Sequence, residues 1–194
     1  MQILRATDLI ETPWKNGGGI TRNIAEGRTP LHSAWRISRA DVAQDGAFSN
    51  FAGLHRILTV VAGAGMDLVH PGGTLRAALW KPVQFDGGLA VTSRLLDGPL
   101  TDFNLMFDPT LCTGTVRVRQ GPLAMTMAPS ATGTTAIHVL AGKPRLDAQV
   151  LDMADTAFLT GPADVTLSKT DAILEIALEA RDQSPPITLC IAGQ

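Results

Sequence analysis

The sequence predicts an all-β chain in which a jelly-roll-like antiparallel β-barrel occurs twice. Apolar or alternating runs of roughly five to eight residues recur, separated by Gly, Pro, Asp or Ser, which is typical of antiparallel sandwiches and barrels. Helical periodicity is scarce, and a faint internal repeat indicates duplication. With 194 residues and 45% hydrophobic content, the chain suits one domain or two small fused ones.

The strand prediction rests on runs that follow one another along the whole chain. They cover residues 20–25, 35–42, 55–61, 74–80, 102–107, 115–120, 136–141, 165–168 and 172–178. Residues 6–14 are expected to hold one helical turn, which Pro13 helps to end. Two alanine-rich segments, 152–158 and 172–182, could also be helices because Ala, Leu and Glu favour that state. Its neighbours favour a strand for the second of them.

The internal repeat relates residues 57–68 to residues 135–146. Both segments run from an apolar strand through Ala-Gly and a turn into another strand, which makes Gly63 and Gly142 equivalent. A late turn follows each copy, FDGG in the first and LTGPAD in the second. The repeat predicts an N-terminal barrel over residues 1–112 and a C-terminal barrel over residues 113–194. We expect them to exchange strands, because shared edges hide unpaired N–H groups, and so to form one globular unit.

Composition excludes several classes of partner. The formal net charge is −2, the isoelectric point is about 6.0 and no polybasic run occurs, so nucleic acid is not expected as a partner. No window reaches the roughly 18 apolar residues of a membrane span, and the first residues do not form a signal peptide. The two cysteines, Cys112 and Cys190, form no disulfide framework and are expected to be small core residues. We therefore expect a cytoplasmic protein.

Local motifs for catalysis or metal binding are absent from the sequence. The four histidines, His32, His55, His70 and His138, show no spacing that converges on one ion, so we expect neither a metal nor another cofactor. There is no nucleophile elbow and no catalytic cysteine signature. Asp41 and Asp45 could be paired carboxylates, although loop capping is the commoner role for such aspartates. No catalytic residue is predicted.

The stretch PWKNGGGITRNIA is the first candidate ligand-binding segment. Consecutive glycines lose much backbone entropy on folding, so the chain needs positive φ or a close backbone approach there. Glycine N–H groups could also cradle an anion, although the motif order of a phosphate loop is lacking and no helix follows. The alternative is a tight, irregular entry into the next strand. The candidate residues are Trp14, Lys15, Asn16, Gly17, Gly18, Gly19 and Arg22.

The second candidate segment is the strand WRISRADV. Alternation places Trp35, Ile37 and Arg39 on one face and Arg36, Ser38 and Ala40 on the other. A guanidinium that points into a cavity suits a carboxylate, so Arg36 and Ser38 join the candidate site, together with Arg56 and the polar Asn104. The competing account is that Arg22 and Arg36 pair internally with Asp41 or Asp45 and only hold loops in place.

These segments resemble the HutD/Ves family of cupin-like proteins. The resemblance rests on PWKNGGGITRNIA, on WRISRADVAQDGAFSNFAGLHRILTVVAGAGM, and on FDGG with RLLDGPLTDFNLMF. It is specific over residues 2–107 and continues as a loose pattern beyond them. The sequence departs from the family pattern after DFNLM, where a basic stretch is usual, and at His55, where the family more often has Asp. The resemblance therefore implies the pocket rather than the ligand.

The resemblance implies a bicupin, two β-barrels in one compact chain. It also implies a role in sensing or buffering an anionic intermediate of histidine degradation, for which formylglutamate and urocanate are candidates. The expected protein is a non-catalytic bicupin that binds such a small anionic metabolite. A cupin-like enzyme acting on a small carboxylate and a structural or protein-interaction module are the alternatives. The sequence does not decide between a monomer and a homodimer.

Overall fold

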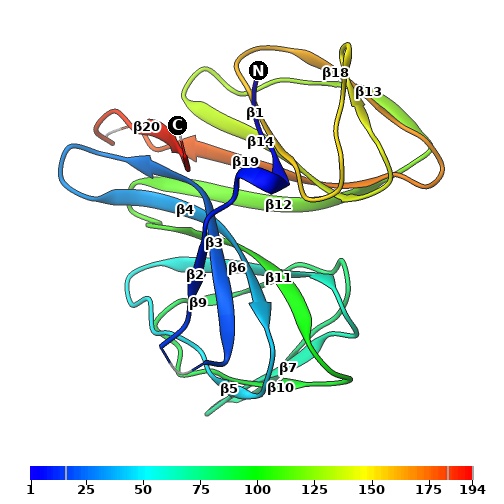
Figure 1. Cartoon of the computed structure of the whole chain (residues 1–194). Coiled ribbons are helices and arrows are strands. Elements are labelled where there is room, and N and C mark those ends of the chain that lie inside the picture. Colours follow the sequence, from blue (N-terminus) through cyan, green and yellow to red (C-terminus); the bar gives the residue numbers. More distant parts are fainter. Residues whose placement is uncertain (16, 183, 194) are drawn as a thin grey trace.

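The computed structural model describes residues 1–15, 17–182 and 184–193, and they form four β-sheets in two halves. Figure 1 shows one half, from β2 (Glu11–Pro13) to β11 (Leu100–Phe107), below the other, from β12 (Cys112–Gln120) to β19 (Ala172–Ala180). Each half has an inner sheet that faces the other half and an outer sheet beyond it. The single helical element is the 3-10 turn η1 (Ala6–Asp8), so no helix in the described part of the chain could cross a membrane.

The first half contains a seven-stranded inner sheet and a four-stranded outer sheet. The first inner sheet has the order β2 (Glu11–Pro13), β3 (Gly19–Arg28), β4 (Ser33–Val42), β11 (Leu100–Phe107), β6 (His55–Ala62) and β9 (Val83–Asp86), with β20 (Thr188–Ile191) also on β3. The first outer sheet has the order β5 (Gly46–Ala47), β10 (Thr92–Leu95), β7 (Met66–His70) and β8 (Gly73–Ala77).

The second half repeats this arrangement with a five-stranded inner sheet and a four-stranded outer sheet. The second inner sheet has the order β1 (Gln2–Leu4), β17 (Thr156–Leu159), β14 (Gly133–Ala141), β19 (Ala172–Ala180) and β12 (Cys112–Gln120). The second outer sheet has the order β13 (Leu123–Met127), β18 (Ala163–Leu167), β15 (Arg145–Leu146) and β16 (Gln149–Val150). All pairings between these strands are antiparallel, as the sequence predicts.

The largest apolar cluster lies between the two inner sheets. It joins side chains of β4, β6 and β11 from one half to side chains of β12, β14 and β19 from the other, among them Trp35, Phe103, Phe107, Leu174 and Ile176. Smaller clusters fill the space between inner and outer sheet within each half. The molecule is therefore a stack of four sheets whose main core is the contact between its halves.

Strand alternation assigns opposite faces of β4, β6 and β11 to different tasks. On β11, Phe103, Leu105 and Phe107 enter the core between the halves, whereas Asn104 and Met106 face the interior of the first half. The same period of two runs through β4 and β6, whose strands flank β11 in register. The predicted division of the strand WRISRADV into two faces is confirmed.

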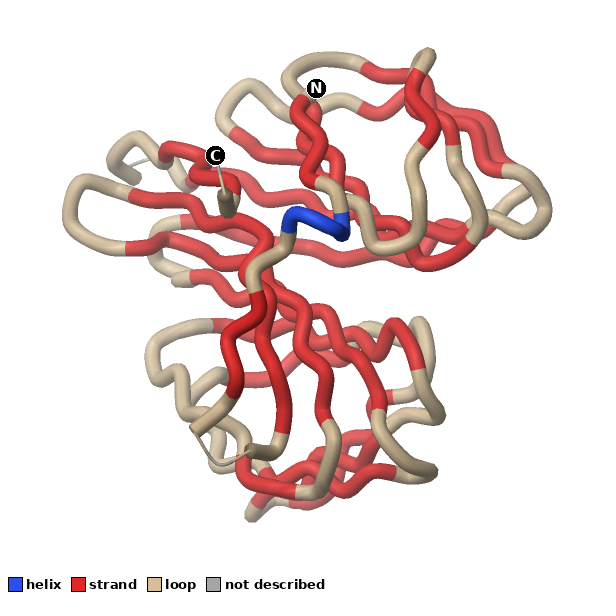
Figure 2. The backbone as a smooth tube through the Cα atoms, in the orientation of Figure 1, coloured by secondary structure: helices blue, strands red, loops and turns tan. Residues whose placement is uncertain are grey.

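The two ends of the chain pair with strands of the half to which they do not belong in sequence. β1 pairs with β17 in the second inner sheet, and β20 pairs with β3 in the first. Figure 2 shows η1 between β1 and β2, where the chain passes from one half to the other. The predicted helical turn is therefore present, but it ends at Asp8, and Pro13 lies in β2 instead of ending it.

Both alanine-rich segments contain strands and no helix among the described residues. The strand predicted at the ambiguous 172–182 segment is confirmed as β19. The other alanine-rich segment ends in the strand β17, in which Ala157 and Phe158 are fully buried between the neighbouring strands β1 and β14. None of the four hydrogen-bonded strand orders closes into a ring among the described residues, so each half consists of two open sheets. The predicted boundary between residues 112 and 113 stays a prediction.

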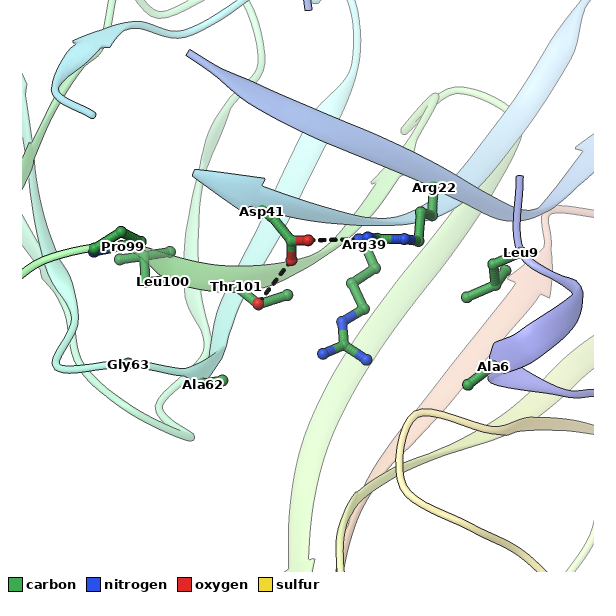
Figure 3. Close-up of a pocket in the computed structure, with 10 residues that line it drawn as sticks. All are labelled: Ala6, Leu9, Arg22, Arg39, Asp41, Ala62, Gly63, Pro99, Leu100 and Thr101. Atoms are coloured by element: carbon green, nitrogen blue, oxygen red, sulfur yellow. Dashed lines mark hydrogen bonds and ion pairs between the residues drawn. The ribbon is translucent and has the colours of Figure 1, made fainter. Parts of the chain in front are cut away.

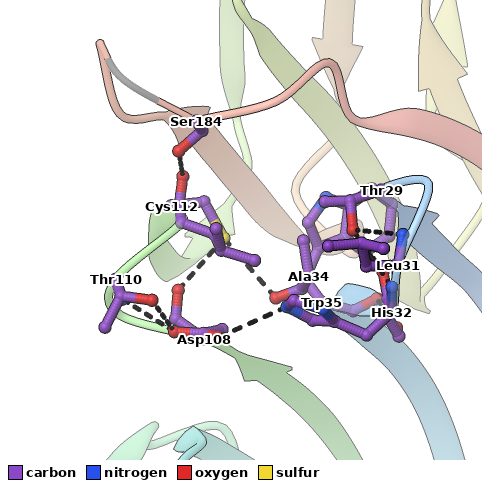
Figure 4. A network of polar contacts seen from close by, with 11 residues as sticks. Thr29, Leu31, His32, Ala34, Trp35, Asp108, Thr110, Cys112 and Ser184 are labelled. Carbon is purple, nitrogen blue, oxygen red and sulfur yellow. Dashed lines mark hydrogen bonds and ion pairs between the residues drawn. The ribbon is translucent and has the colours of Figure 1, made fainter.

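A polar network fixes the crossover from the first half to the second (Figure 4). The Cys112 sulfur lies 3.7 Å from the carbonyl oxygens of both Ala34 and Asp108. Asp108 Oδ1 accepts hydrogen bonds from the backbone N–H and the hydroxyl of Thr110, at 2.8 and 2.6 Å. Burial raises the pKa of Cys112 to about 11, so the thiol stays protonated at neutral pH. Both cysteines are free; Cys112 is a core residue as expected, whereas Cys190 is only half-buried, contrary to the expectation from the sequence.

One buried histidine lies within the contact between the halves. The ring of His138 on β14 packs 4.8 Å from that of Phe103, and its Nδ1 lies 2.8 Å from the Thr156 hydroxyl. Burial, reinforced by the positive charge of Arg39, lowers the pKa of His138 to about 3. The folded protein therefore holds this imidazole neutral, whereas the unfolded chain protonates it below about pH 6.5.

This difference predicts a loss of stability on acidification. Between pH 6.5 and pH 3 the unfolded chain binds a proton at His138 that the folded chain does not, so stability falls as pH falls. Between pH 7 and pH 5 this proton lowers the free energy of unfolding of the unmodified protein by about 2 kcal/mol. We therefore expect His138→Gln to lose about 2 kcal/mol less than the unmodified protein over this range. Urea unfolding at both pH values measures it. The exposed His32→Gln is the control, and equal losses in all three proteins would contradict the assignment.

Candidate functional site

A pocket of about 440 Å³ opens in the first half, on the face of the inner sheet that points away from the second half. Its walls come from β4, β6 and β11, from the loop at residues 47–51, and from the hairpin between β2 and β3. The lining side chains that carry polar groups are Lys15, Thr21, Arg36, Ser38, Ser49, Arg56, Asp102 and Asn104. A cavity of this size matches those that hold small molecules.

Arg56 is the most unusual of these residues, because its side chain is only 7% exposed. The guanidinium carbon lies 4.7 Å from the centre of the Phe48 ring, 5.9 Å from that of Phe51 and 5.5 Å from that of Phe85. Burial lowers the pKa of Arg56 to about 10, which still leaves it charged at neutral pH. Three aromatic rings thus hold a desolvated cation at the pocket wall.

Asn104 and Asp102, both on β11, orient the Arg56 guanidinium through a chain of hydrogen bonds. Nε and Nη2 of Arg56 both donate to Asn104 Oδ1, at 2.8 and 2.7 Å, and the Asn104 amide donates to Asp102 Oδ1. Asp102 is 1% exposed, and its Oδ2 has no hydrogen-bond partner among the described residues. Burial raises the pKa of Asp102 to about 6, despite the opposing effects of Arg56 and of the Asn104 hydrogen bond.

Arg36 brings a second guanidinium to the same pocket. It lies 5.4 Å from the centre of the Phe51 ring, and its buried Nε has no hydrogen-bond partner in the described part of the chain. Burial lowers its pKa. The charge of Glu26, opposite Arg36 on β3, opposes this pKa shift, but the Glu26 carboxylate forms its ion pair with the Arg28 guanidinium, with Nε 2.7 Å from Oε1. Arg36 is therefore available to an anion that enters the pocket.

The glycine-rich hairpin forms the rim of the pocket. Trp14 and Lys15 line the opening, and Trp14 Nε1 donates to Thr21 Oγ1 at 2.7 Å. Gly17 adopts a φ of 69° and donates its N–H to the Trp14 carbonyl at 3.0 Å. A Cβ on Gly19 would lie 2.3 Å from the Asp41 carbonyl oxygen. The glycines meet the steric demands of a tight hairpin, as the sequence predicts.

The structure gathers most of the predicted site and separates some of it. Six predicted residues line the pocket: Trp14, Lys15, Arg36, Ser38, Arg56 and Asn104. Gly17, Gly18 and Gly19 form the adjoining hairpin, and Asn16 lies outside the described residues.

Arg22 does not reach this pocket, because it follows Thr21 by one residue and so points to the opposite face of β3. There Arg22 Nη1 donates to Asp41 Oδ2 at 2.6 Å, and Nη2 donates to Glu11. The account in which arginines only pair internally thus fits Arg22. It does not fit Arg36, which forms no ion pair with any described residue. Asp45 caps a loop by accepting from the Leu95 N–H at 2.7 Å.

Sequence reasoning missed the aromatic rings around Arg56 and the carboxyl group of Asp102. The backbone N–H groups of Phe48 and Phe51 donate to the carbonyl oxygens of Val91 and Gly87 and so anchor the loop that carries them. Their rings also contact Arg56, a contact that no local pattern encodes. Asp102 stands two residues before Asn104 on a strand, so period-two alternation was a usable signal for it.

The described residues contain no group of three or more His, Cys, Asp or Glu side chains placed to hold a metal ion. His32 is exposed, His55 and His70 are partly exposed, and His138 is buried between the halves. No histidine lines the pocket. The chemistry that the pocket offers is therefore that of two guanidinium groups, an ammonium group and a buried carboxyl.

These features define an all-β protein of the cupin-like class with a small polar pocket in its first half. The HutD family profile matches residues 6–175, which is most of the chain. The chain belongs to the HutD family.

Three relatives illustrate this membership. An uncharacterized 21.2 kDa protein in the hutC 3' region of Pseudomonas putida is 44% identical over 114 residues, 56% of this chain. Protein Ves of Cronobacter sakazakii is 35% identical over 108 residues, 54% of this chain. The chain spans 59% of the length of each of these two curated relatives. The structure of HutD from Pseudomonas fluorescens SBW25, described as a formate condition, has a TM-score of 0.81 at 31% identity and covers 93% of this chain and 98% of its own.

The buried carboxyl of Asp102 predicts an unusual pH dependence of stability. Its pKa is about 6 in the folded chain against an ordinary 3.8, so the folded state binds the extra proton between these values. The contribution of Asp102 to stability therefore falls as pH rises from 4 through 6, opposite to the contribution of His138. We expect Asp102→Asn to be more stable than the unmodified protein by about 3 kcal/mol at pH 8, and by about half that at pH 5.

Chemical unfolding at the two pH values measures this difference. The matched control is Asp97→Asn, at an exposed position on the same half, which should change stability little at either pH. The charged groups that act on Asp102 are Arg56, which favours its ionised form, and Asp41, which opposes it. A variant less stable than the unmodified protein at pH 8 would mean that the attraction to Arg56 outweighs burial.

Proposed function

We propose that this HutD-family protein binds a small anionic metabolite in the pocket of its first half and is not a catalyst. The observation that carries the proposal is the convergence of Arg36 and Arg56 on one cavity in which no described carboxylate pairs with Arg36. A cation in a partly dry pocket binds a carboxylate more strongly than one at the surface, since competing water is excluded.

The arrangement of the pocket favours an anion that accepts two parallel hydrogen bonds from a planar guanidinium group. Asn104 fixes the orientation of the Arg56 guanidinium through two hydrogen bonds, and the Phe51 ring contacts both arginines. Lys15 adds a positive charge at the rim. A preorganised donor set loses little side-chain entropy when the ligand binds.

Histidine degradation supplies the candidate ligands. The Pseudomonas putida relative is named as a protein in the hutC 3' region, and this chain matches the HutD family. The resemblance noted from the sequence links that family to histidine degradation. Formylglutamate and urocanate are anionic intermediates of that degradation, and we propose that the protein senses or buffers one of them. A bicupin organisation, with each pair of sheets acting as one barrel-like unit, belongs to the same proposal. The cytoplasmic location and the absence of nucleic-acid and membrane partners stay predictions from the sequence.

Calorimetric titration tests the proposal with urocanate, formylglutamate and glutamate. Loss of an arginine fork on a carboxylate removes roughly 1.5–3 kcal/mol, so Arg36→Gln should weaken binding by about ten- to a hundredfold. Arg56 is buried among aromatic rings, so Arg56→Gln should lower both affinity and melting temperature. Melting temperatures of all variants are measured in parallel.

Arg22→Gln is the matched control, because Arg22 lies on the opposite face of the same sheet. It should change the affinity for the anion less than Arg36→Gln, whatever it does to stability. Failure of all three anions to bind the unmodified protein would sink the metabolite proposal. Release of a new product, followed by NMR of the ligand, would instead show an enzyme.

A further inference from the structure

A second cleft lies on the other face of the first inner sheet, at the seam between the two halves (Figure 3). It has a volume of about 570 Å³. Its walls are η1 with Leu9 on one side and the Ala62–Gly63 turn with Pro99 and Leu100 on the other, while β3, β4 and β11 contribute Arg22, Arg39, Asp41 and Thr101. The proposed metabolite pocket uses the opposite face of the same strands.

Arg39 is the unsatisfied group in this cleft. Its buried Nε has no hydrogen-bond partner, and its guanidinium forms no ion pair, among the described residues. Figure 3 shows this guanidinium directed into the open space of the cleft, away from the contact between Arg22 and Asp41. Burial without a partner is costly for a cation, which suggests that something else completes its surroundings.

The carboxylates near Arg39 are already engaged. Asp41 accepts from Arg22 Nη1 at 2.6 Å and from the Thr101 hydroxyl at 2.8 Å. Asp155 accepts from Arg5 Nη1 at 2.6 Å and from the N–H of Ala6, the first residue of η1, at 2.9 Å. Asp41 shares Arg22 with Glu11, and its charge also acts on Arg39, but no carboxylate of the described residues lies within ion-pair distance of the Arg39 guanidinium.

The shape and chemistry of the remaining wall define the missing partner. Ala6, Leu9, Ala62 and Pro99 present apolar surface around the Arg39 guanidinium, which forms no ion pair with any described residue. An anion with one charged end and an apolar body satisfies both, because a forked carboxylate matches the guanidinium while the body covers the aliphatic wall.

We propose that this cleft is a second ligand site, which binds a small monocarboxylate with an apolar tail. Arg39 holds the carboxylate, and the side chains of Leu9, Ala62 and Pro99 hold the tail. The site is independent of the metabolite pocket, since the two lie on opposite faces of the sheet. Because η1 links β1 of one half to β2 of the other, a ligand here contacts the segment that joins the halves.

The test follows the Nε–H signals of arginine by NMR while benzoate is added to the full chain. The Arg39 signal, identified by its absence from Arg39→Lys, should shift and saturate in the millimolar range. Neutral benzamide should leave the signal unmoved. Inorganic phosphate should shift it at least tenfold more weakly than benzoate, because phosphate cannot use the apolar wall.

Variants separate this site from the metabolite pocket. Arg36→Gln should leave the response of Arg39 to benzoate unchanged, whereas Ala62→Asp, which adds a carboxylate at an exposed position of the cleft, should weaken benzoate by about tenfold. The titration of the unmodified protein keeps the test valid if Arg39→Lys folds poorly, because backbone assignment then identifies the signal. The proposal fails if the Arg39 signal does not saturate, if benzamide or phosphate matches benzoate, or if Ala62→Asp binds benzoate unchanged.

Discussion

The face-to-face packing of the two inner sheets is the contact on which the rest of the molecule depends. It holds the largest apolar cluster, and it fixes which face of β4, β6 and β11 is turned away from the second half. A slip of one residue in β4 or β6 would turn Arg36 or Arg56 into the core and expel an aromatic or aliphatic side chain. The register that builds the core therefore also builds the pocket.

Buried charge is the exception to this apolar design. A guanidinium among three phenylalanine rings and a carboxyl at 1% exposure both lose hydration on folding. Apolar residues of similar volume are often at least as stable as such a pair, so stability alone does not explain Arg56 and Asp102. Their arrangement is better understood as a binding surface held in place by Asn104 and the aromatic rings.

The sequence predicted well wherever a short-range rule decides the outcome. Alternation placed Arg36 and Ser38 together on one face, and the steric demands of Gly17 and Gly19 marked the hairpin at the rim. It predicted poorly where residues that are close together in the sequence lie on opposite faces of the sheet. Arg22 is close to Lys15 in sequence but faces the other way, because a strand changes face at every residue.

Contacts between distant segments were out of reach for the same reason. Phe85 joins Phe48 around Arg56 only because β9 pairs with β6, and nothing local encodes that pairing. The closure of each half was also overestimated. Repeated strands and glycine turns predict the number and direction of strands, but the closure of a barrel depends on pairing between edge strands, which a linear pattern does not record.

The exchange of terminal strands bears on how the chain is made and on how it could be divided. While the polypeptide emerges from the ribosome, β3 has one open edge until Thr188–Ile191 arrives, nearly the whole chain later. A cut near Leu111 would give two fragments, each of which lacks a strand that the other contains. The N-terminal fragment lacks β20, so part of one edge of β3 is unpaired. The C-terminal fragment lacks β1, so one edge of β17 is unpaired. Such fragments should recombine with each other or pair with copies of themselves, so neither half is a separable module.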